Sequence, residues 1–316
     1  MSNSISIKDY KIVEEINTGG SGRQFYRCIK NKKTFILVKD REIKNYLRLQ
    51  RHLERRDIGV PKIYKTDEKA NVFIMEDLGK ESLYELVMKK RRNLYNLYRM
   101  AIIELIKLQI DAYQRVPINI YYDYGHIKWE QDYFKEFFLH QFCGVPEKKL
   151  RVLDSDFKYL TEILTEELKS MNNFLMHRDY QSQNIFIKNG RIRIIDFQSA
   201  RIGPPTYDLA ALLKDSYVHI SKKLERDLIN YYFGCLRKRG IEFRKEKFLK
   251  MYRLSGLQRN MQALGAFANL SLNKNKTHFW QYIPRGLALL KSGLKNTEFQ
   301  NLSRIVNEVA VEKVRM

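Results

Sequence analysis

Short apolar runs in the first part of the chain have the length and residue types of β-strands. They occupy residues 10–16, 23–29 and 34–39, with the glycine-rich NTGGSG between the first two runs and the polar NKK before the third. Two more runs, at 62–64 and 71–76, flank the polar segment DEKAN. We therefore expect five short strands joined by turns.

The spacing of apolar residues becomes helical at two places. Residues 42–56 follow the third strand at mostly helical spacing, which predicts one helix in the strand-rich part. After Ser82 the helical pattern dominates, and its first apolar stripe contains Leu94, Leu97, Ala101, Ile102, Leu105 and Leu108. We expect an α+β protein with two lobes: a small β-rich N-lobe over residues 1–78 and a larger, mostly helical C-lobe over 79–316.

One interruption of the helical pattern predicts a β-hairpin. In NIFIKNGRIRIIDF, apolar runs at 185–187 and 192–195 are separated by the pair Asn189-Gly190. Both residues of this pair tolerate positive φ, so the pair suits a tight hairpin turn.

Three polar side chains lie at the ends of this hairpin. Asp179 and Asn184 precede it in MHRDYQSQNIF, and Asp196 follows it. Because a hairpin brings its ends together, we expect these side chains to converge near the boundary between the lobes. Carboxylate and amide oxygens are hard ligands, and Mg²⁺ binds through one or two carboxylates together with substrate phosphates. The alternative is that they are only cap and turn residues.

Composition limits the class of protein and its partners. The chain has 316 residues, of which 44% are hydrophobic and 30% charged, as in a globular protein with a real core. Its net charge of +22 attracts anions and disfavours polycationic substrates. The basic runs at 48–56, 89–92 and 244–250 lack the interleaved aromatic residues of a base-stacking surface, so we interpret them as solvated helix faces and expect no nucleic-acid partner.

Cysteine usage and hydropathy indicate the compartment. Cys28, Cys143 and Cys235 are far apart and lack the spacing of a disulfide framework or a zinc site. The N-terminus MSNSISIKDY lacks the charge and apolar pattern of a signal peptide, and no run has the length of a membrane span. We expect a cytoplasmic protein without a membrane span.

The spacing HRDxxxxN, followed by DF twelve residues after the asparagine, resembles the catalytic loop and metal-binding aspartate of the protein-kinase-like superfamily. The resemblance implies a bilobal protein-kinase-like fold that uses ATP and Mg²⁺. It implies that Asp179 accepts the proton of the attacking hydroxyl and that Asn184 and Asp196 hold the metal. It also implies a structural role for His177, and Arg178 would support the loop.

The loop NTGGSGRQF lies between two predicted strands, where glycines let backbone N–H groups approach phosphates. The expected contacts are Gly19, Gly20, Ser21 and Gly22. It is not a Walker loop, because no GK[ST] follows it and no helix begins there. A simple hairpin turn is the alternative.

Two further nucleotide contacts are implied by the resemblance. Lys39 falls where kinases place the lysine that touches the α- and β-phosphates. Its partner stays open between Glu42 and Glu54, and a surface role is the alternative. The segment NVFIMEDLG resembles the hinge, with Met75 beside the adenine pocket and the backbone of Glu76 to Leu78 at the adenine edge.

The sequence after Asp196 reads DFQSARIGPPTYDLAALL, with glutamine where protein kinases have the glycine of DFG. It contains no APE-like residues or long activation segment, so we do not expect a protein kinase. PTYDLA resembles the aminoglycoside phosphotransferase branch of the superfamily, in which Asp208 would brace the catalytic loop from a helix start.

The blocks MHRDYQSQNIF, DFQSARIGPPTYDLAALLKDSY and GLQRNMQALGAFANL (256–270) are most similar to anomeric sugar kinases that phosphorylate N-acetylmuramate and N-acetylglucosamine in cell-wall recycling. This implies ATP-dependent transfer of the γ-phosphoryl to the anomeric hydroxyl of an amino sugar. Arg259 is then a candidate sugar contact, although it could instead brace a helix. The aromatic-rich stretch 118–138 could wall a sugar site or belong to the core.

Other readings stay open. The acceptor could be an aminoglycoside, choline or another sugar, and GTP could replace ATP. The protein could also be a nucleotide-binding pseudoenzyme or bind nucleic acid through its basic surface. The sequence does not reveal which hydroxyl is phosphorylated or the oligomeric state.

Overall fold

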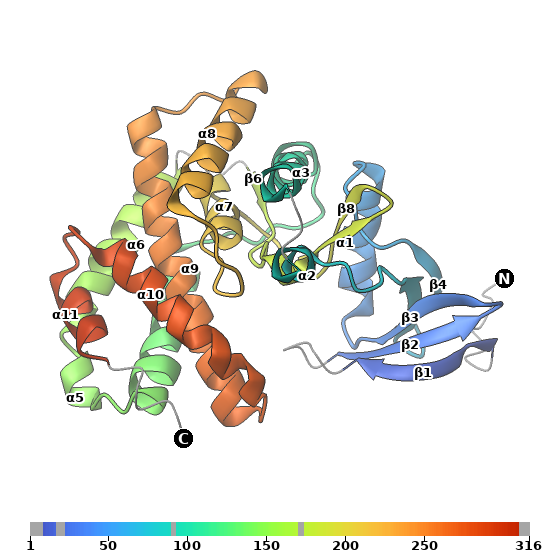
Figure 1. Ribbon diagram of the computed structural model, residues 1–316, viewed down its shortest axis with the longest axis horizontal. Coiled ribbons are helices and arrows are strands. Elements are labelled where there is room, and N and C mark those ends of the chain that lie inside the picture. Colours follow the sequence, from blue (N-terminus) through green and yellow to red (C-terminus); the bar gives the residue numbers. More distant parts are fainter. Residues whose placement is uncertain (1–8, 17–22, 90–92, 170–173, 310–316) are drawn as a thin grey trace.

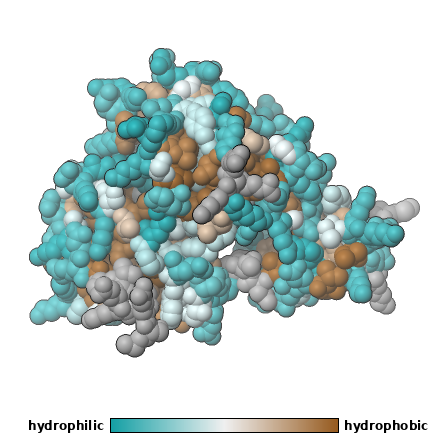
Figure 2. All heavy atoms as spheres, in the orientation of Figure 1, coloured by the Kyte–Doolittle hydropathy of each residue, from teal (hydrophilic) through white to brown (hydrophobic). Residues whose placement is uncertain are grey.

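A computed structural model describes residues 9–16, 23–89, 93–169 and 174–309. A small sheet with one helix lies at one end of the molecule, and a larger helical part lies at the other (Figure 1). Polar side chains cover most of the face seen in Figure 2, and the surface is hollowed between the two parts. The expected small β-rich lobe and larger helical lobe are confirmed. No helix among the described residues is long and apolar enough to cross a membrane.

The N-lobe is a five-stranded antiparallel sheet in the order β1-β2-β3-β5-β4. Its elements are β1 (Lys11–Ile16), β2 (Gln24–Lys30), β3 (Lys33–Lys39), α1 (Ile43–Arg55), β4 (Ile63–Asp67) and β5 (Val72–Glu76). All five strands and the helix agree with the sequence prediction. Alternation along β3 separates the two faces of the sheet: Val38 packs with α1, whereas Leu37 packs with Cys28 on the opposite face.

The C-lobe is mostly helical. It contains α2 (Leu83–Met88), α3 (Leu94–Ile106), η2 (Lys107–Asp111), α4 (Tyr124–Tyr133), η3 (Phe134–Phe142), α5 (Glu147–Leu150), α6 (Leu153–Lys169), α7 (Pro205–Leu213), α8 (Lys222–Lys238), α9 (Lys245–Asn273), η6 (Thr277–Tyr282), α10 (Ile283–Leu294) and α11 (Gln300–Glu308). The helix α9 packs against α4, η3, α7 and α10 and has buried residues on all sides, so it forms the centre of this lobe.

Short strands carry the chain past the catalytic region. β6 (Phe174–Met176) pairs with β9 (Arg201–Gly203), and β7 (Ile185–Lys188) pairs with β8 (Arg191–Ile194). The β7-β8 turn is Asn189-Gly190, and both residues have positive φ, at 51° and 72°. The expected hairpin and its turn are confirmed.

A close backbone contact joins the hairpin to the segment between α1 and β4. The carbonyl of Gly59 accepts a hydrogen bond from the N–H of Ile194 at 2.6 Å. A Cβ at Gly59 would lie 2.0 Å from the carbonyl oxygen of Ile192, so only glycine fits here. The same residue donates its N–H to Glu104 Oε1 at 2.5 Å. Gly59 therefore connects the N-lobe, α3 and the hairpin at one point.

Candidate active site

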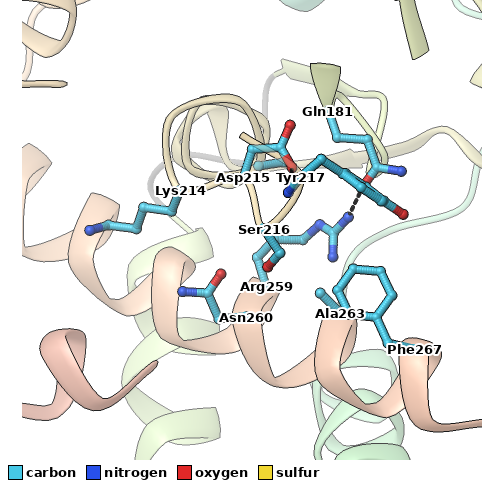
Figure 3. A pocket seen from close by; sticks show the side chains of 10 residues that line it. Gln181, Lys214, Asp215, Ser216, Tyr217, Arg259, Asn260, Ala263 and Phe267 are labelled. Atoms are coloured by element: carbon cyan, nitrogen blue, oxygen red, sulfur yellow. Dashed lines mark hydrogen bonds between the residues drawn. The ribbon is translucent and has the colours of Figure 1, made fainter. Parts of the chain in front are cut away.

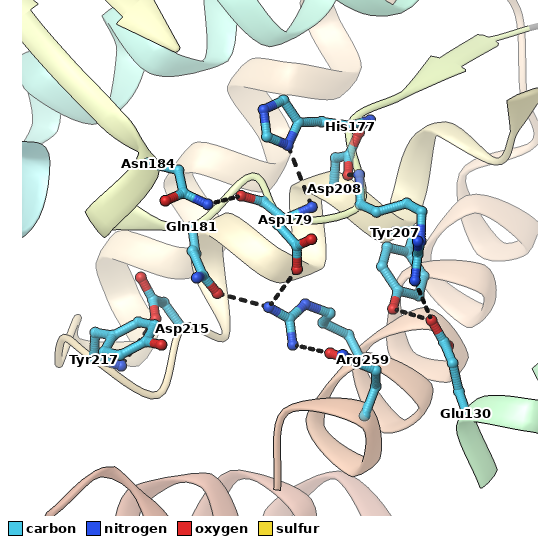
Figure 4. A network of polar contacts seen from close by, with 12 residues as sticks. Glu130, His177, Asp179, Gln181, Asn184, Tyr207, Asp208, Asp215, Tyr217 and Arg259 are labelled. Carbon is cyan, nitrogen blue, oxygen red and sulfur yellow. Dashed lines mark hydrogen bonds and ion pairs between the residues drawn. The ribbon is translucent and has the colours of Figure 1, made fainter. Parts of the chain in front are cut away.

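The catalytic loop begins where β6 ends, and a buried carboxylate holds its backbone (Figure 4). Asp208 Oδ2 accepts the backbone N–H of His177 at 2.7 Å, and Oδ1 accepts that of Arg178 at 2.8 Å. Pro204 and Pro205 start α7 and place Asp208 in its first turn. Burial raises the pKa of Asp208 to about 7, although the two N–H donors favour its charged form. The bracing role expected of Asp208 thus has a direct geometric basis.

His177 is 1% exposed and bonds within the loop. Its Nε2 lies 2.9 Å from the carbonyl of Ile195, and its Nδ1 lies 3.3 Å from the backbone nitrogen of Asp179. An imidazole with these partners donates through Nε2 and accepts through Nδ1, so it is neutral. Burial lowers the pKa of His177 to about 4. His177 therefore supports the loop between β6 and the residue that follows β8.

The hairpin ends meet as expected. Asn184 Nδ2 donates to the carbonyl of Asp179 at 2.9 Å, and the carbonyl of Asn184 accepts the N–H of Ile195 at 3.0 Å. Because its nitrogen is engaged with the loop backbone, the side-chain oxygen of Asn184 faces the other way (Figure 4). The three polar residues are thus connected through the backbone of the loop and the hairpin.

Asp196 follows β8 in the left-handed conformation, with φ of 60°. This conformation is rare for non-glycine residues and is enriched at functional positions. Desolvation raises the pKa of Asp196, and the nearby Asp179 carboxylate adds to the rise. A cation bound beside Asp196 would oppose both effects, because it favours the charged carboxylate.

The oxygen donors fit Mg²⁺. Asp196 offers a carboxylate, Asn184 offers an amide oxygen, and Asp179 lies beside them with a side chain that is 35% exposed. Among the described residues, no group of three His, Cys, Asp or Glu side chains surrounds one point. Mg²⁺ does not require such a group, since substrate phosphates and water usually complete its shell.

A buried network behind the loop was not predicted from the sequence. At its centre is Glu130, which is 0% exposed. Its partners are the hydroxyls of Tyr122 and Tyr207, the amide of Gln258, the ring of His126 and the guanidinium of Arg178. Burial alone would raise the pKa of Glu130, but these neighbours more than offset it and lower the pKa. Since Arg178 has a φ of 77°, this carboxylate holds the side chain of a residue in an unfavourable backbone conformation.

Part of the aromatic stretch 118–138 belongs to the core, whereas Tyr121, Tyr124 and Trp129 are exposed. Tyr122, Phe134 and Phe138 are each at most 1% exposed and belong to the C-lobe core. Glu130, on α4, is the polar residue of this stretch whose carboxylate contacts Arg178 of the catalytic loop. No local motif around Glu130 indicates that its side chain faces the catalytic loop.

Arg259 lies next to Asp179 and Gln181 of the catalytic loop (Figure 4). Its Nη2 is 3.5 Å from Asp179 Oδ1 and donates to Gln181 Oε1 at 2.6 Å, while Nη1 donates to Gln262 Oε1 at 2.6 Å. Arg259 is 6% exposed although it carries a charge. The guanidinium thus bridges α9 and the loop, with its charge directed at Asp179.

A small pocket lies beside this contact (Figure 3). Its lining includes Gln181, Asp215, Tyr217, Arg259, Asn260 and Phe267. Asp215 also braces the loop, because its carboxylate accepts the backbone N–H groups of Ser182 at 2.8 Å and Tyr217 at 2.9 Å. Polar groups and aromatic rings therefore line a cavity of about 10 Å³, enough for one water molecule, and Arg259 links this cavity to Asp179.

Within the part of the chain that the structure describes, Lys39 has its ring contact in the N-lobe and none with the catalytic loop. Its side chain is exposed, and its Nζ lies 5.6 Å from the ring centre of Tyr26. Tyr26 packs with the cluster on the sheet face away from α1. The candidate partner Glu54 instead accepts a hydrogen bond from Gln50 at 3.3 Å. On the other face, Arg23 lies close to Asp196, with Nη1 3.8 Å from Oδ1.

The candidate hinge lies between the lobes. Met75 is buried, and its sulfur lies 3.7 Å from the hydroxyl of Tyr46. Glu76 donates its N–H to the carbonyl of Lys62 at 2.8 Å, and its carboxylate lies 2.9 Å from Lys188 Nζ. Leu78 follows and is partly exposed. The contact of this segment with adenine stays a prediction. The other expected nucleotide contacts, Gly19, Gly20, Ser21 and Gly22, lie outside the described residues.

Comparisons with known proteins agree with this geometry. The model of the phosphotransferase enzyme family matches residues 12–246. An N-acetylmuramate/N-acetylglucosamine kinase from Neisseria meningitidis serogroup B is 26% identical over 251 residues, which cover 78% of this chain and 73% of that protein. Among solved structures, a choline/ethanolamine kinase family protein from Mesorhizobium loti has a TM-score of 0.61 at 15% identity and covers 93% of this chain and 92% of that one.

A third similar structure contains a nucleotide analogue. It is an amicoumacin kinase in complex with AMP-PNP, Ca²⁺ and Ami, with a TM-score of 0.62 at 12% identity, covering 97% of this chain and 92% of that one. These likenesses confirm the protein-kinase-like fold. With most of its length matched by the family model and its catalytic loop braced as described, the chain belongs to the phosphotransferase enzyme family and is a phosphotransferase that acts on a hydroxyl acceptor.

Proposed function

We propose that the protein is an ATP-dependent kinase that transfers the γ-phosphoryl group to the anomeric hydroxyl of N-acetylmuramate or N-acetylglucosamine. The observation that carries the proposal is the position of Asp179 on the braced loop, where its carboxylate lies 3.5 Å from Arg259, a residue that lines the small pocket. The acceptor is supported by the names of relatives that are about a quarter identical to this chain.

Each residue of the site has a defined task in this proposal. Asp179 accepts the proton of the attacking hydroxyl and orients it, while Asn184 and Asp196 hold Mg²⁺. Mg²⁺ neutralises charge on the phosphates when it is bound. Phosphoryl transfer requires little covalent chemistry from the protein, so positioning by the braced loop supplies most of the catalysis.

The binding groups for the nucleotide are the hinge and the glycine loop. The backbone of Glu76 to Leu78 meets the adenine edge beside Met75, and N–H groups at 19–22 approach the phosphates. Since its substrates are ATP and a free sugar, we place the reaction in the cytoplasm, in the reuse of amino sugars released from the cell wall.

The proposal is tested with purified protein, ATP and Mg²⁺ against a panel of acceptors. N-Acetylmuramate, N-acetylglucosamine, choline and an aminoglycoside are compared by ADP release and by phosphate on the product. We expect turnover of at least one amino sugar and none of its methyl glycoside, because the glycoside lacks a free anomeric hydroxyl. Phosphorylation of the glycoside would contradict the anomeric assignment, and turnover of choline or the aminoglycoside alone would contradict the acceptor class.

The role of Asp179 has its own test. Asp179→Asn keeps the size of the side chain but removes the proton acceptor, so we expect turnover to fall by about a hundredfold or more while ATP binding persists. The exposed carboxylate of Asp227 on α8 pairs with Lys223, so Asp227→Asn is a matched control with wild-type turnover. Normal turnover in Asp179→Asn would disprove the assignment.

A further inference from the structure

Two neighbours hold Arg23 in a fixed orientation. Its Nε lies 2.9 Å from Asp40 Oδ2, and its guanidinium carbon lies 5.8 Å from the ring centre of Tyr46 on α1. Asp40 is 7% exposed and Tyr46 is 5% exposed, so both supports belong to the packed N-lobe. Because Nε contacts Asp40 and one face of the guanidinium lies against the ring, Arg23 can bind a further partner only through its two Nη groups.

That edge faces the candidate metal ligand. Arg23 Nη1 lies 3.8 Å from Asp196 Oδ1, which is beyond hydrogen-bond length. A phosphate oxygen that shares a Mg²⁺ with a carboxylate oxygen lies within about 4 Å of it, the sum of two Mg–O bonds. A phosphate bound on the Arg23 side of Asp196 would therefore lie near the Nη edge, which offers donors for two of its oxygens.

Lys39 cannot reach this place without leaving its own face of the sheet. Successive side chains on a strand point to opposite faces. Val38 packs on the α1 face, and Lys39 follows it onto the face of Tyr26. Asp40 returns to the α1 face, where it contacts Arg23. The residue that follows β3 on the α1 face is thus acidic, and the positive charge comes from Arg23, just before β2.

We propose that Arg23, oriented by Asp40, binds the β- or γ-phosphate of the nucleotide in the place of a β3 lysine. The inference rests on the proposed ATP-dependent function, and it assigns the task expected of Lys39 to a different residue. Arginine is suited to bind phosphate, because its charge is permanent and its guanidinium can donate to two phosphate oxygens at once.

A purely structural role for Arg23 would be neutralisation of the buried Asp40. The two roles differ in what they predict for ligands of different charge. A phosphate-binding Arg23 strengthens the binding of ATP and ADP but not of adenosine, whereas a structural Arg23 affects all three together. The double variant Arg23→Met with Asp40→Asn removes both charges, so the N-lobe is not left with an unpaired buried carboxylate.

The test measures the affinities of the full-length protein for ATP, ADP and adenosine with Mg²⁺ by isothermal titration calorimetry, without an acceptor. Thermal unfolding is recorded for each variant. In Arg23→Met and in the double variant, we expect the affinity for ATP to fall by about tenfold or more, the range for a lost hydrogen bond to a charged group, with little change for adenosine. Arg23→Lys should lose less. Arg41→Met replaces an exposed arginine next to Asp40 and is the matched control.

The outcomes separate the two proposals. Equal losses for ATP and adenosine, or a selective loss for ATP in Lys39→Met and not in Arg23→Met, would overturn the role of Arg23. If the wild type phosphorylates an amino sugar and Arg23→Met binds ATP normally, the inference fails and the proposed function stands. If the wild type binds no ATP and phosphorylates no acceptor, both fail.

Discussion

Asp208 and His177 are joined by a hydrogen bond of 2.7 Å, in which a fully buried carboxylate of α7 accepts the first backbone N–H of the catalytic loop. Its other oxygen accepts the next N–H, that of Arg178. Two adjacent amides thus converge on one carboxylate, which fixes the direction in which the loop leaves β6. The position of Asp179 depends on this contact, although Asp208 does not touch the pocket.

The variant Asp208→Asn should uncouple the loop from α7. An amide can accept only one of the two hydrogen bonds, and its NH₂ group would face the other N–H. We expect the free energy of unfolding to fall by about 1.5–3 kcal/mol, the cost of a lost hydrogen bond to a charged acceptor, and turnover to fall with it. Urea unfolding and initial rates measure both effects. Wild-type stability and turnover in this variant would show that the two bonds do not hold the loop.

Arg259 should affect the binding of the acceptor more than the binding of the nucleotide. Its guanidinium bridges Gln181 and Gln262 beside Asp179, and it lines the small pocket. We expect Arg259→Met to raise the KM for the sugar and lower kcat/KM by about tenfold or more, with the KM for ATP unchanged. Steady-state kinetics with each substrate varied in turn measure the split.

The charge of the sugar makes this test sharper. If Arg259 contacts the carboxylate of N-acetylmuramate, the loss in Arg259→Met should be larger for that sugar than for the neutral N-acetylglucosamine. Lys250 is an exposed cation on the same helix, so Lys250→Met controls for the loss of one positive charge. Equal losses for the two sugars would assign Arg259 to the positioning of Asp179 alone.

The lobes, the hairpin and the catalytic loop could be predicted because their signals are local. Strand and helix periodicity, the Asn189-Gly190 turn and the fixed separation of Asp179, Asn184 and Asp196 each depend on neighbours in the sequence. A hairpin converts that short-range pattern into proximity, so no knowledge of packing was required.

Contacts that depend on packing between distant elements could not be predicted in this way. Glu130 meets Arg178 from α4, and Arg23 meets Asp40 and Asp196 across the sheet and the lobes. A carboxylate or a guanidinium in a chain with 58 basic and 36 acidic residues gives no sign of its partner. One signal was present for the N-lobe: alternation along β3 places Lys39 on the face opposite Val38.

The stability of the protein should depend on pH through His177. Burial lowers its pKa from the usual 6.5 to about 4, so between these values the unfolded chain binds a proton that the folded protein does not. The free energy of unfolding therefore falls as the pH falls through this window, by up to about 1.4 kcal/mol per pH unit. Asp208 has the opposite effect on stability. Folding raises its pKa from 3.8 to about 7, so its contribution to the free energy of unfolding grows as the pH falls through this range.

Comparison of variants isolates the histidine. In His177→Gln the amide can still donate to Ile195, and Asp208 is unchanged. We expect the wild type to lose about 1.6 kcal/mol more than this variant between about pH 6.5 and about pH 5 in urea unfolding. His278 is exposed, so His278→Gln should behave as the wild type. Parallel pH profiles for wild type and His177→Gln would show that the imidazole is not held neutral.

The contact at Gly59 should be sensitive to a single methyl group. A Cβ there would lie 2.0 Å from the carbonyl oxygen of Ile192 and 3.3 Å from Glu104 Oε1. The nearest atom belongs to the backbone of β8, so the clash cannot be relieved by a side-chain rotation. We expect Gly59→Ala to lower the free energy of unfolding by about 1–3 kcal/mol, the usual cost of overpacking.

The same variant should also affect catalysis, because β8 leads directly into Asp196. A shift of Ile192 and Ile194 away from Gly59 moves that carboxylate relative to Asn184, so turnover should fall and the Mg²⁺ concentration for half-maximal rate should rise. Gly234, inside α8, has no atom within 4 Å of an added Cβ. Gly234→Ala should therefore stabilise the protein by about 0.5–1 kcal/mol and leave the Mg²⁺ dependence unchanged. If both variants gave the same stability and the same Mg²⁺ dependence, the junction at Gly59 would not position the end of the hairpin.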